Sequence, residues 1–264
     1  MLPFGDSQLG RKASEILAAT LRSEQISVFD SDLARAAARG AGYTPSLNMS
    51  VGDAQTFGAA IGSDFYVLGD AQTLRRSPST GTIYFEAYAS IFLVSSRTGR
   101  LVSWQRPHFK GPSAAEVEKL LLNSLSQDSL KEAVLLALSQ AKEMERSARA
   151  KALERTLPII EVAPDDDKIA AAEGMRLPRP FRRLQPPYPE TAAEAEAEAV
   201  VDVLVDLDAN GNVVNAEIAR WAGFGLDEVT LATVRKLQFF PAQRDGNPIP
   251  LRVLLRYNFR KPPQ

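Results

Sequence analysis

The sequence contains no cysteine and only one histidine, His108. The absence of cysteine excludes disulfide bonds, thiolate nucleophiles and Cys-based zinc sites, and it leaves the redox compartment open. A single histidine also excludes most His-based metal sites. Neither sign of charge is in excess, because 31 Lys and Arg residues balance 32 Asp and Glu residues. The chain therefore has no global basic field that would favour nucleic acid or an anionic membrane as a partner.

Long hydrophobic runs are missing as well. No stretch of about 18 apolar residues occurs, so no segment of this sequence is predicted to span a bilayer. The first residues also lack the pattern of a signal peptide. They form a short apolar stretch, residues 2–4, which a Gly-Asp turn and a helical pattern follow directly. Two interpretations stay open: a first strand cut from a longer precursor that carried an upstream signal or anchor, or a short edge strand that begins at Met1.

The residue patterns of common catalytic sites are scarce. His108 follows Pro107 and precedes a Lys-Gly-Pro run, which predicts a loop histidine rather than a member of a Ser-His-Asp set. No G-x-S-x-G elbow, Walker loop or complete dinucleotide-binding glycine motif accompanies it. The acidic run at residues 165–167 lies in a predicted linker, where carboxylates stay solvated. The sequence therefore predicts a protein that is not an enzyme and that has no cofactor and no metal site.

At 264 residues the chain is long enough for two domains, each with its own core. In its first part the apolar periodicity predicts helices over residues 7–24, 31–39 and from 50 on, a strand at 26–30, and a strand meander at 64–74, 83–96 and 100–106. A capping box at Ser113 and Glu116 begins another helix, and a long helix follows from Asp128. This order predicts a mixed sheet with flanking helices over residues 1–156.

Residues 157–185 are predicted to be a linker. Prolines recur through this segment, together with the acidic run and a basic patch of four arginines between Arg176 and Arg183. Proline stiffens such a segment, and charge keeps it solvated. The basic patch is predicted to belong to this soluble linker. The alternative is contact with an anionic wall polymer or a lipid head group.

Residues 201–218 admit two interpretations. Asp206, Asp208, Asn210 and Glu217 match a calcium-loop pattern. A loop of that type needs a helix on each side, whereas here apolar and polar residues alternate before and after an Asn-Gly turn. The favoured prediction is a β-hairpin with Asp206 and Asp208 as solvated turn carboxylates, and calcium binding is the alternative.

The last part of the chain, residues 186–264, predicts a small antiparallel sheet with two helices on one face. Residues 188–199 are helix-prone, and residues 226–237 form an amphipathic helix that ends before Pro241. Residues 251–259 alternate as a long strand that is buried on one face. The predicted fold class is therefore α+β or α/β, with an amino-terminal mixed-sheet domain, a proline-containing linker and this smaller carboxyl-terminal sheet.

The order of signals in this last part resembles the carboxyl-terminal domain of the TonB family. Tyr-Pro precedes a helix, V-x-V-x-V leads into a D-x-x-G turn, and a helix ending in VRKLQFFPA is followed by DGNPIPLRVLLRYNF. The resemblance covers residues 186–261. The sequence departs from the family at Ala199, where Gly is common, and in showing neither the membrane helix nor the long proline-rich spacer of TonB proteins.

The resemblance implies a periplasmic protein-binding protein. Its partner would be an outer-membrane TonB-dependent receptor, whose TonB box is recognised as an extended peptide by β-augmentation, or another envelope protein. An amino-terminal segment upstream of this chain would associate it with the membrane. If that segment couples to an inner-membrane proton-motor complex, the resemblance implies energy-coupled transport.

The final strand is the predicted binding edge, because an edge strand presents unpaired N–H and C=O groups that an added strand satisfies. Its exposed row comprises Arg252, Leu254, Arg256 and Asn258. With Arg260, the cations of this row are predicted to favour an acidic neighbour, and the alternative is that they only protect the edge against aggregation. Tyr188 and Pro189 belong to the family motif and either contact a partner or pack the helix entry.

The amino-terminal part resembles bacterial envelope modules, namely the CsgG, TolB amino-terminal and penicillin-binding-protein activator domains. The similarity rests on LPFGD before a helix and on AAIGSDFYVLGDAQTL. Those relatives bind proteins, and several form oligomers or carry lipid anchors, so oligomerisation is left open. The alternative function is an envelope assembly or scaffold adaptor without energy transduction. A third hypothesis is a calcium-dependent or hydrolytic protein that uses Asp206 to Glu217 or His108.

Overall fold

Helices and strands combine in an α+β arrangement, as the sequence predicts. The computed structural model describes residues 1–40, 42, 46–79, 81–154, 160–164 and 167–261. They form two units, each with its own core. Unit 1 comprises Met1–Leu47 and Gly52–Leu153, and unit 2 comprises Asn48–Val51 and Glu154–Gln264.

The sheet of unit 1 is a meander around one central strand. Strand β1 (Phe65–Arg76) pairs with β2 (Tyr84–Ser95) along its whole length. On its other side β2 pairs with β3 (Leu101–Gln105) and then with β4 (His108–Gly111). The two short strands occupy successive parts of the same edge of β2. They are separated at Pro107, which has no N–H group to donate to a ladder.

Every strand pair described in unit 1 is antiparallel, so the predicted mixed sheet is wrong for this unit. The reason is that residues 26–30 do not form a strand. The N–H of Ile26 instead bonds to the carbonyl of Leu21 at the end of the preceding helix, and the Phe29 side chain is half exposed. Residues 2–4 run beside β1, where Leu2 donates to Val67, but they do not form a regular strand either.

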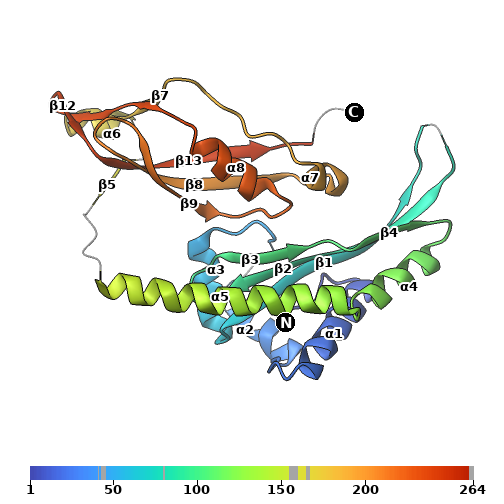
Figure 1. The fold of residues 1–264 in the computed structure, drawn as a ribbon. Helices are drawn as coiled ribbons and strands as arrows, with labels where there is room; N and C mark the ends of the chain where they lie inside the picture. Colours follow the sequence, from blue (N-terminus) through green and yellow to red (C-terminus); the bar gives the residue numbers. More distant parts are fainter. Residues whose placement is uncertain (41, 43–45, 80, 155–159, 165–166, 262–264) are drawn as a thin grey trace. The chain divides into compact units, whose positions relative to one another are not determined.

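The helices of unit 1 are α1 (Gln8–Ser23), α2 (Ser31–Gly40), α3 (Val51–Ile61), α4 (Ala114–Ser124) and α5 (Asp128–Glu154). In Figure 1, α1, α4 and α5 lie on one side of the sheet. They bury the row of β1 and β2 side chains that alternation directs toward them, such as Val67, Ala71 and Ala89. The predicted cap at Ser113 is confirmed, because its hydroxyl accepts the N–H of Glu116.

The main sheet of unit 2 has the order β5-β13-β8-β9. Its central strand β8 (Ala199–Leu207) pairs antiparallel with β9 (Val213–Arg220) and with β13 (Leu251–Phe259). The short strand β5 (Glu161–Val162) adds to the beginning of β13 in parallel orientation, which makes this sheet mixed rather than purely antiparallel. Figure 1 shows β5 beside the start of β13, at the end away from the carboxyl terminus.

Helices α7 and α8 contribute buried side chains to the core of unit 2. In α8 (Leu226–Val234) the buried side chains meet those of β8, whose inward row is at most 1% exposed from Val201 to Leu207. Helix α7 (Glu190–Ala195) is shorter than predicted, because Glu196 adopts a left-handed conformation (φ 51°) that ends it.

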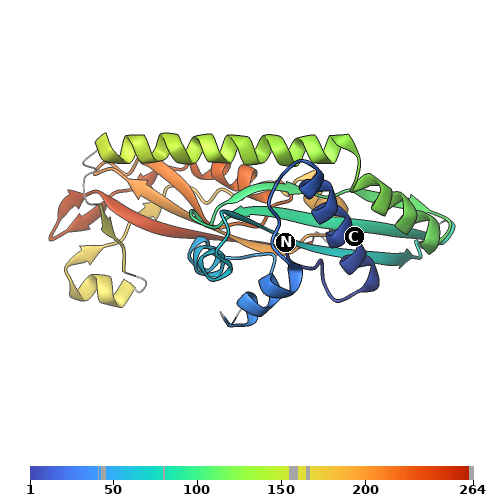
Figure 2. The same cartoon turned by 90° about the horizontal axis from the view of Figure 1, so that it is seen from below.

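Part of the predicted linker is built into unit 2. The predicted linker contains β5, α6 (Asp167–Ala172), β6 (Met175–Arg176) and β7 (Arg179–Pro180). Strand β6 pairs with β11 (Ala242–Arg244), which also pairs with β12 (Asn247–Ile249), and β7 pairs with β10 (Phe239–Phe240). Figure 2 shows β5 and α6 together at the β12 end of this unit. A fully solvated linker is therefore wrong, because Ala170 and Met175 contribute buried side chains to the core.

We predict that the turn at Gly211 tolerates no side chain. Gly211 and Gly246 share φ +83°, but a Cβ on Gly211 would lie 2.0 Å from the carbonyl oxygen of Phe239, whereas a Cβ on Gly246 would meet nothing within 4 Å. Gly246→Ala should cost about 1–2 kcal/mol of unfolding free energy through backbone strain alone. Gly211→Ala should cost roughly 1–3 kcal/mol more through the clash.

The measurement is urea unfolding of the full chain, followed by Trp221 fluorescence in a Trp104→Phe background. The chain has two tryptophans, so this background isolates the signal of buried Trp221 in unit 2. Equal destabilisation by the two alanine substitutions would contradict the prediction.

Candidate functional site

One side of strand β13 is open over most of its length. The strand pairs with β8 through all nine of its residues. On its other side, within the described residues, only β5 pairs with it, at Leu251 and Arg252. The open edge therefore extends from Val253 to Phe259.

A single hydrogen bond shows which backbone groups point outward along this edge. The N–H of Ala163 donates to the carbonyl of Arg252 at 2.8 Å, on the side away from β8. In an antiparallel ladder, successive residues direct their N–H and C=O groups to alternate sides. Leu254, Arg256 and Asn258 share the parity of Arg252, so their backbone groups face the open side. The predicted row of four residues thus lies at the edge, and β5 already bonds to the first of them.

The arginine side chains of this row are paired within the sheet. Arg252 donates two hydrogen bonds to Asp206, at 2.5 and 2.9 Å, and Arg256 donates two to Asp202, at 2.7 and 2.9 Å. Arg220 of β9 donates a further bond to Asp202 at 3.2 Å. Both carboxylate side chains are only 6% exposed. The cations predicted to favour an acidic partner are therefore already neutralised at positions 252 and 256, because each faces an aspartate on β8.

These ion pairs set the protonation of both carboxyl groups. Hydrogen bonds from Arg256 hold the pKa of Asp202 below its usual value, and those from Arg252 do the same for the pKa of Asp206. The two carboxylates are therefore charged at neutral pH and act as fixed acceptors. Leu254 lies between the two arginines with its side chain 49% exposed, and it forms an apolar spot on this charged face.

A groove of about 590 Å³ lies beside the open edge, on the other face of β13. Leu255, Tyr257 and Phe259 contribute one wall of it. The remaining lining residues are Pro180, Arg183, Leu184, Gln185, Pro186, Tyr188, Leu237, Phe239, Arg256, Asn258 and Arg260. Apolar and aromatic side chains form most of the lining of the groove, and the exposed cations Arg183 and Arg260 are among the remaining lining residues.

Tyr188 is held rigidly in the wall of this groove. Its hydroxyl donates to the carbonyl of Ala197 at 2.7 Å, and its ring lies 6.5 Å from that of Phe259. Pro189 is not among the lining residues and stands at the start of α7. Of the two predicted motif residues, the structure thus brings only Tyr188 to the edge. The sequence does not predict that the segment from Pro180 to Pro186 lines the groove, because its prolines and arginines are typical of a linker.

The hairpin between β8 and β9 is confirmed, and its carboxylates are engaged in it. Asp208 accepts the N–H groups of Asn210 and Asn212 at 2.9 and 2.8 Å, which closes the turn. Asp206 is buried against Arg252 instead of being a solvated turn carboxylate. The described residues contain no group of three or more His, Cys, Asp or Glu side chains that could hold a metal ion.

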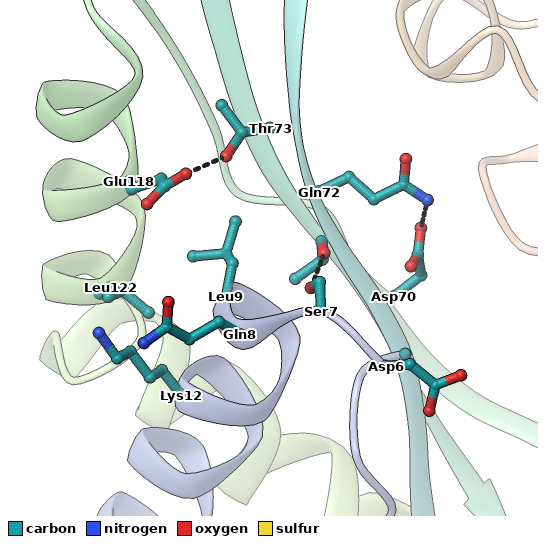
Figure 3. A pocket seen from close by; sticks show the side chains of 12 residues that line it. Asp6, Ser7, Gln8, Leu9, Lys12, Asp70, Gln72, Thr73, Glu118 and Leu122 are labelled. Carbon is teal, nitrogen blue, oxygen red and sulfur yellow. Dashed lines mark hydrogen bonds between the residues drawn. The ribbon is translucent and has the colours of Figure 1, made fainter.

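Unit 1 contains a second cavity, of about 550 Å³, where β1 lies beside the start of α1 (Figure 3). Its polar groups do not converge. Asp70 and Gln72 bond to each other on one face of β1, whereas Thr73 bonds to Glu118 of α4 on the other face. Ser7 donates to the backbone carbonyl of Ala71 and caps α1 by accepting the N–H of Gly10, so its hydroxyl is engaged with the backbone.

The single histidine lies in a strand. His108 is the first residue of β4 and pairs with Tyr88 of β2, so the predicted loop position is wrong. The strand forms because the free edge of β2 continues past Pro107 and accepts a second short partner. Among the described helices, none is both long enough and apolar enough to cross a membrane.

Comparison with known proteins identifies the part of the chain that carries this edge. Residues 184–260 match the family model of the Gram-negative bacterial TonB protein C-terminal domain. A solution NMR structure of the Pseudomonas aeruginosa TonB C-terminal domain is similar, with 19% sequence identity and a TM-score of 0.29, over 33% of this chain and 89% of that chain. No curated protein matches the sequence.

We predict that Asp206→Asn destabilises unit 2 at neutral pH but not in acid. The native pKa of Asp206 is lowered, so its contribution is present above the ordinary carboxyl pKa and is lost as pH falls through the native value. The effect at pH 7 should be up to about 1 kcal/mol, since the arginine is partly solvated. Urea unfolding at pH 7 and at pH 2–3 measures it, and a pH-independent difference would refute the ion-pair origin.

Proposed function

We propose that this chain is a TonB-like protein, because residues 184–260 match the TonB C-terminal family model, and that it recognises the TonB box of outer-membrane transporters as an added strand on β13. TonB C-terminal domains interact with outer-membrane receptors. Domains of this family are non-enzymatic protein-interaction domains, and the family suggests a periplasmic or envelope location. The observation that carries the proposal is the open edge at Leu254, Arg256 and Asn258.

The edge supplies the backbone part of recognition. Three outward-facing residues offer one N–H and one C=O each, which is the set that an extended peptide satisfies when it extends a sheet. Each new backbone bond contributes about 0.5–1.5 kcal/mol net. Backbone pairing alone therefore gives modest affinity with little sequence preference, and side-chain contacts must supply the rest.

The groove and the charged face supply those contacts. An added strand directs alternate side chains to opposite faces of the sheet. On one face they would enter the groove beside Tyr257 and Phe259. Arg183 and Arg260, which also line the groove, would pair there with an acidic group of the peptide. On the other face they would lie over Leu254 and the paired arginines. The proposed partner is therefore an extended peptide with apolar residues at alternate positions and an acidic residue near one end.

We predict that Leu254→Pro abolishes peptide binding without unfolding unit 2. Proline removes the outward N–H of residue 254 and no bond of the β8 ladder, because that N–H faces away from β8. A labelled TonB-box peptide, titrated against the full chain in a fluorescence anisotropy experiment, should bind at least about tenfold more weakly to this variant. Leu254→Ala keeps the N–H and should lose less than about threefold.

A second experiment leaves the protein unchanged. Peptides that are N-methylated at single successive positions should lose affinity at alternate positions only, since alternate N–H groups of an added strand face β13. Unchanged affinity of Leu254→Pro, together with uniform tolerance of N-methylation, would refute strand addition at this edge.

Energy-coupled transport is the further part of the proposal. It rests on the family alone and requires an inner-membrane proton-motor partner for the full protein. Source cells in which Leu254→Pro replaces the natural residue should lose uptake through TonB-dependent transporters, whereas Leu254→Ala cells should retain it. Normal uptake in cells that lack the gene would instead favour an envelope adaptor without a role in transport.

A further inference from the structure

The chain's own strand β5 occupies the beginning of the edge on which the proposed function rests. Glu161 and Val162 pair in parallel with Leu251 and Arg252. The N–H of Ala163 then donates to the outward carbonyl of Arg252. β5 and an incoming peptide would therefore use the same side of β13 and the same kind of backbone bond. Of the nine residues of β13, β5 covers two and leaves seven open.

Strand β5 is held by few interactions of its own. Glu161 is exposed, and Val162 has 64% of its surface exposed, so the pairing buries little apolar area. The side chain of Glu161 bonds to Arg244 at 2.5 Å, and both side chains are more than a third exposed. Solvent screens such a pair. These contacts alone would not hold a separate peptide on β13.

What holds β5 in place is its attachment to a well-anchored segment. The helix and strand that follow it, α6 and β6, bury Ala170 and Met175 in the core of unit 2. β6 also pairs with β11 at Arg244, the residue that bonds to Glu161. This short tether keeps β5 at a high effective concentration beside Arg252. A strand with weak contacts and a short tether can be displaced locally without unfolding the domain.

We propose that β5 is an intramolecular cap that sets how far along β13 a partner strand can extend. This inference rests on the proposed function. A peptide pairs with residues 253–259, and to reach Leu251 or Arg252 it must first displace β5. The cap thus fixes the register of the partner, because one end of a seven-residue window is closed by the chain itself. Shorter and longer peptides with the same core sequence are therefore bound about equally well.

Two proline variants distinguish the loss of the hydrogen bond to β13 from the introduction of a proline as such. Ala163→Pro removes the N–H that bonds to Arg252. Val162→Pro is the matched control, because the alternation of the backbone points the N–H of residue 162 away from β13. Both variants place a proline in or beside β5, and only the first removes a hydrogen bond to β13.

The probes are three labelled peptides: a seven-residue TonB-box peptide and two nine-residue versions, each extended by two residues at one end. On the natural chain and on Val162→Pro, all three should bind with similar affinity. On Ala163→Pro, one nine-residue peptide should bind about threefold to tenfold more tightly than the seven-residue peptide, since it gains the outward backbone groups of Arg252. The end whose extension gives the gain also reveals whether the added strand runs parallel or antiparallel to β13.

An equal advantage of a nine-residue peptide on the natural chain and on Ala163→Pro would overturn the cap, as would no advantage on either. If no peptide binds any version of the chain, the proposed function itself fails. Arg244→Gln provides a variant that changes no backbone donor, in case Ala163→Pro misfolds. It frees Glu161 and should shift the preference in the same direction by a smaller factor, and the absence of any shift would count against the cap.

Discussion

The antiparallel ladder between β8 and β13 is the constraint on which the candidate site depends. Because β8 pairs with one side of β13 along its whole length, only the other side of β13 can accept a further strand. The parity of the ladder decides which residues direct their backbone groups to that side. The same parity places each arginine of β13 opposite an aspartate of β8 where side chains approach most closely: Arg252 faces Asp206, and Arg256 faces Asp202. Backbone availability and side-chain pairing therefore follow from one register.

Those ion pairs also change what the edge can recognise. An unpaired carboxylate at the burial of Asp202 or Asp206 would be strongly unfavourable, so the arginines serve first to neutralise the sheet. Their long stems cover the exposed face of β8 and β13 at the same time. The charge that remains for a partner is provided by Arg183 and Arg260 at the groove. Selectivity is thus expected from apolar shape and from one end of the edge, and not from a row of cations.

The sequence predicts the parts of unit 2 whose signals are local. Alternation of apolar and polar residues over eight or nine positions defines β8, β9 and β13, and an Asn-Gly turn defines the hairpin. The sequence therefore predicts the exposed row of Leu254, Arg256 and Asn258. The short strands β5 and β7 cannot be found this way, because two-residue pairings depend on an edge that only the folded sheet provides. The burial of Asp206 is hidden for the same reason, since its partner Arg252 is 46 residues away.

Open strand edges favour unwanted pairing between copies of a protein, and this sheet limits them in two places. At the β9 edge, Ser50 bridges to Arg220, and the side chain of Asn48 donates to the carbonyl of Trp221, the residue after β9. At the β13 edge, β5 covers the first two residues. Each edge is therefore covered at one end by a segment distant in sequence. What distinguishes the remaining stretch of β13 is that an apolar groove lies beside it. The open stretch of β13 is therefore expected to prefer strands whose side chains fit the groove over strands of arbitrary sequence.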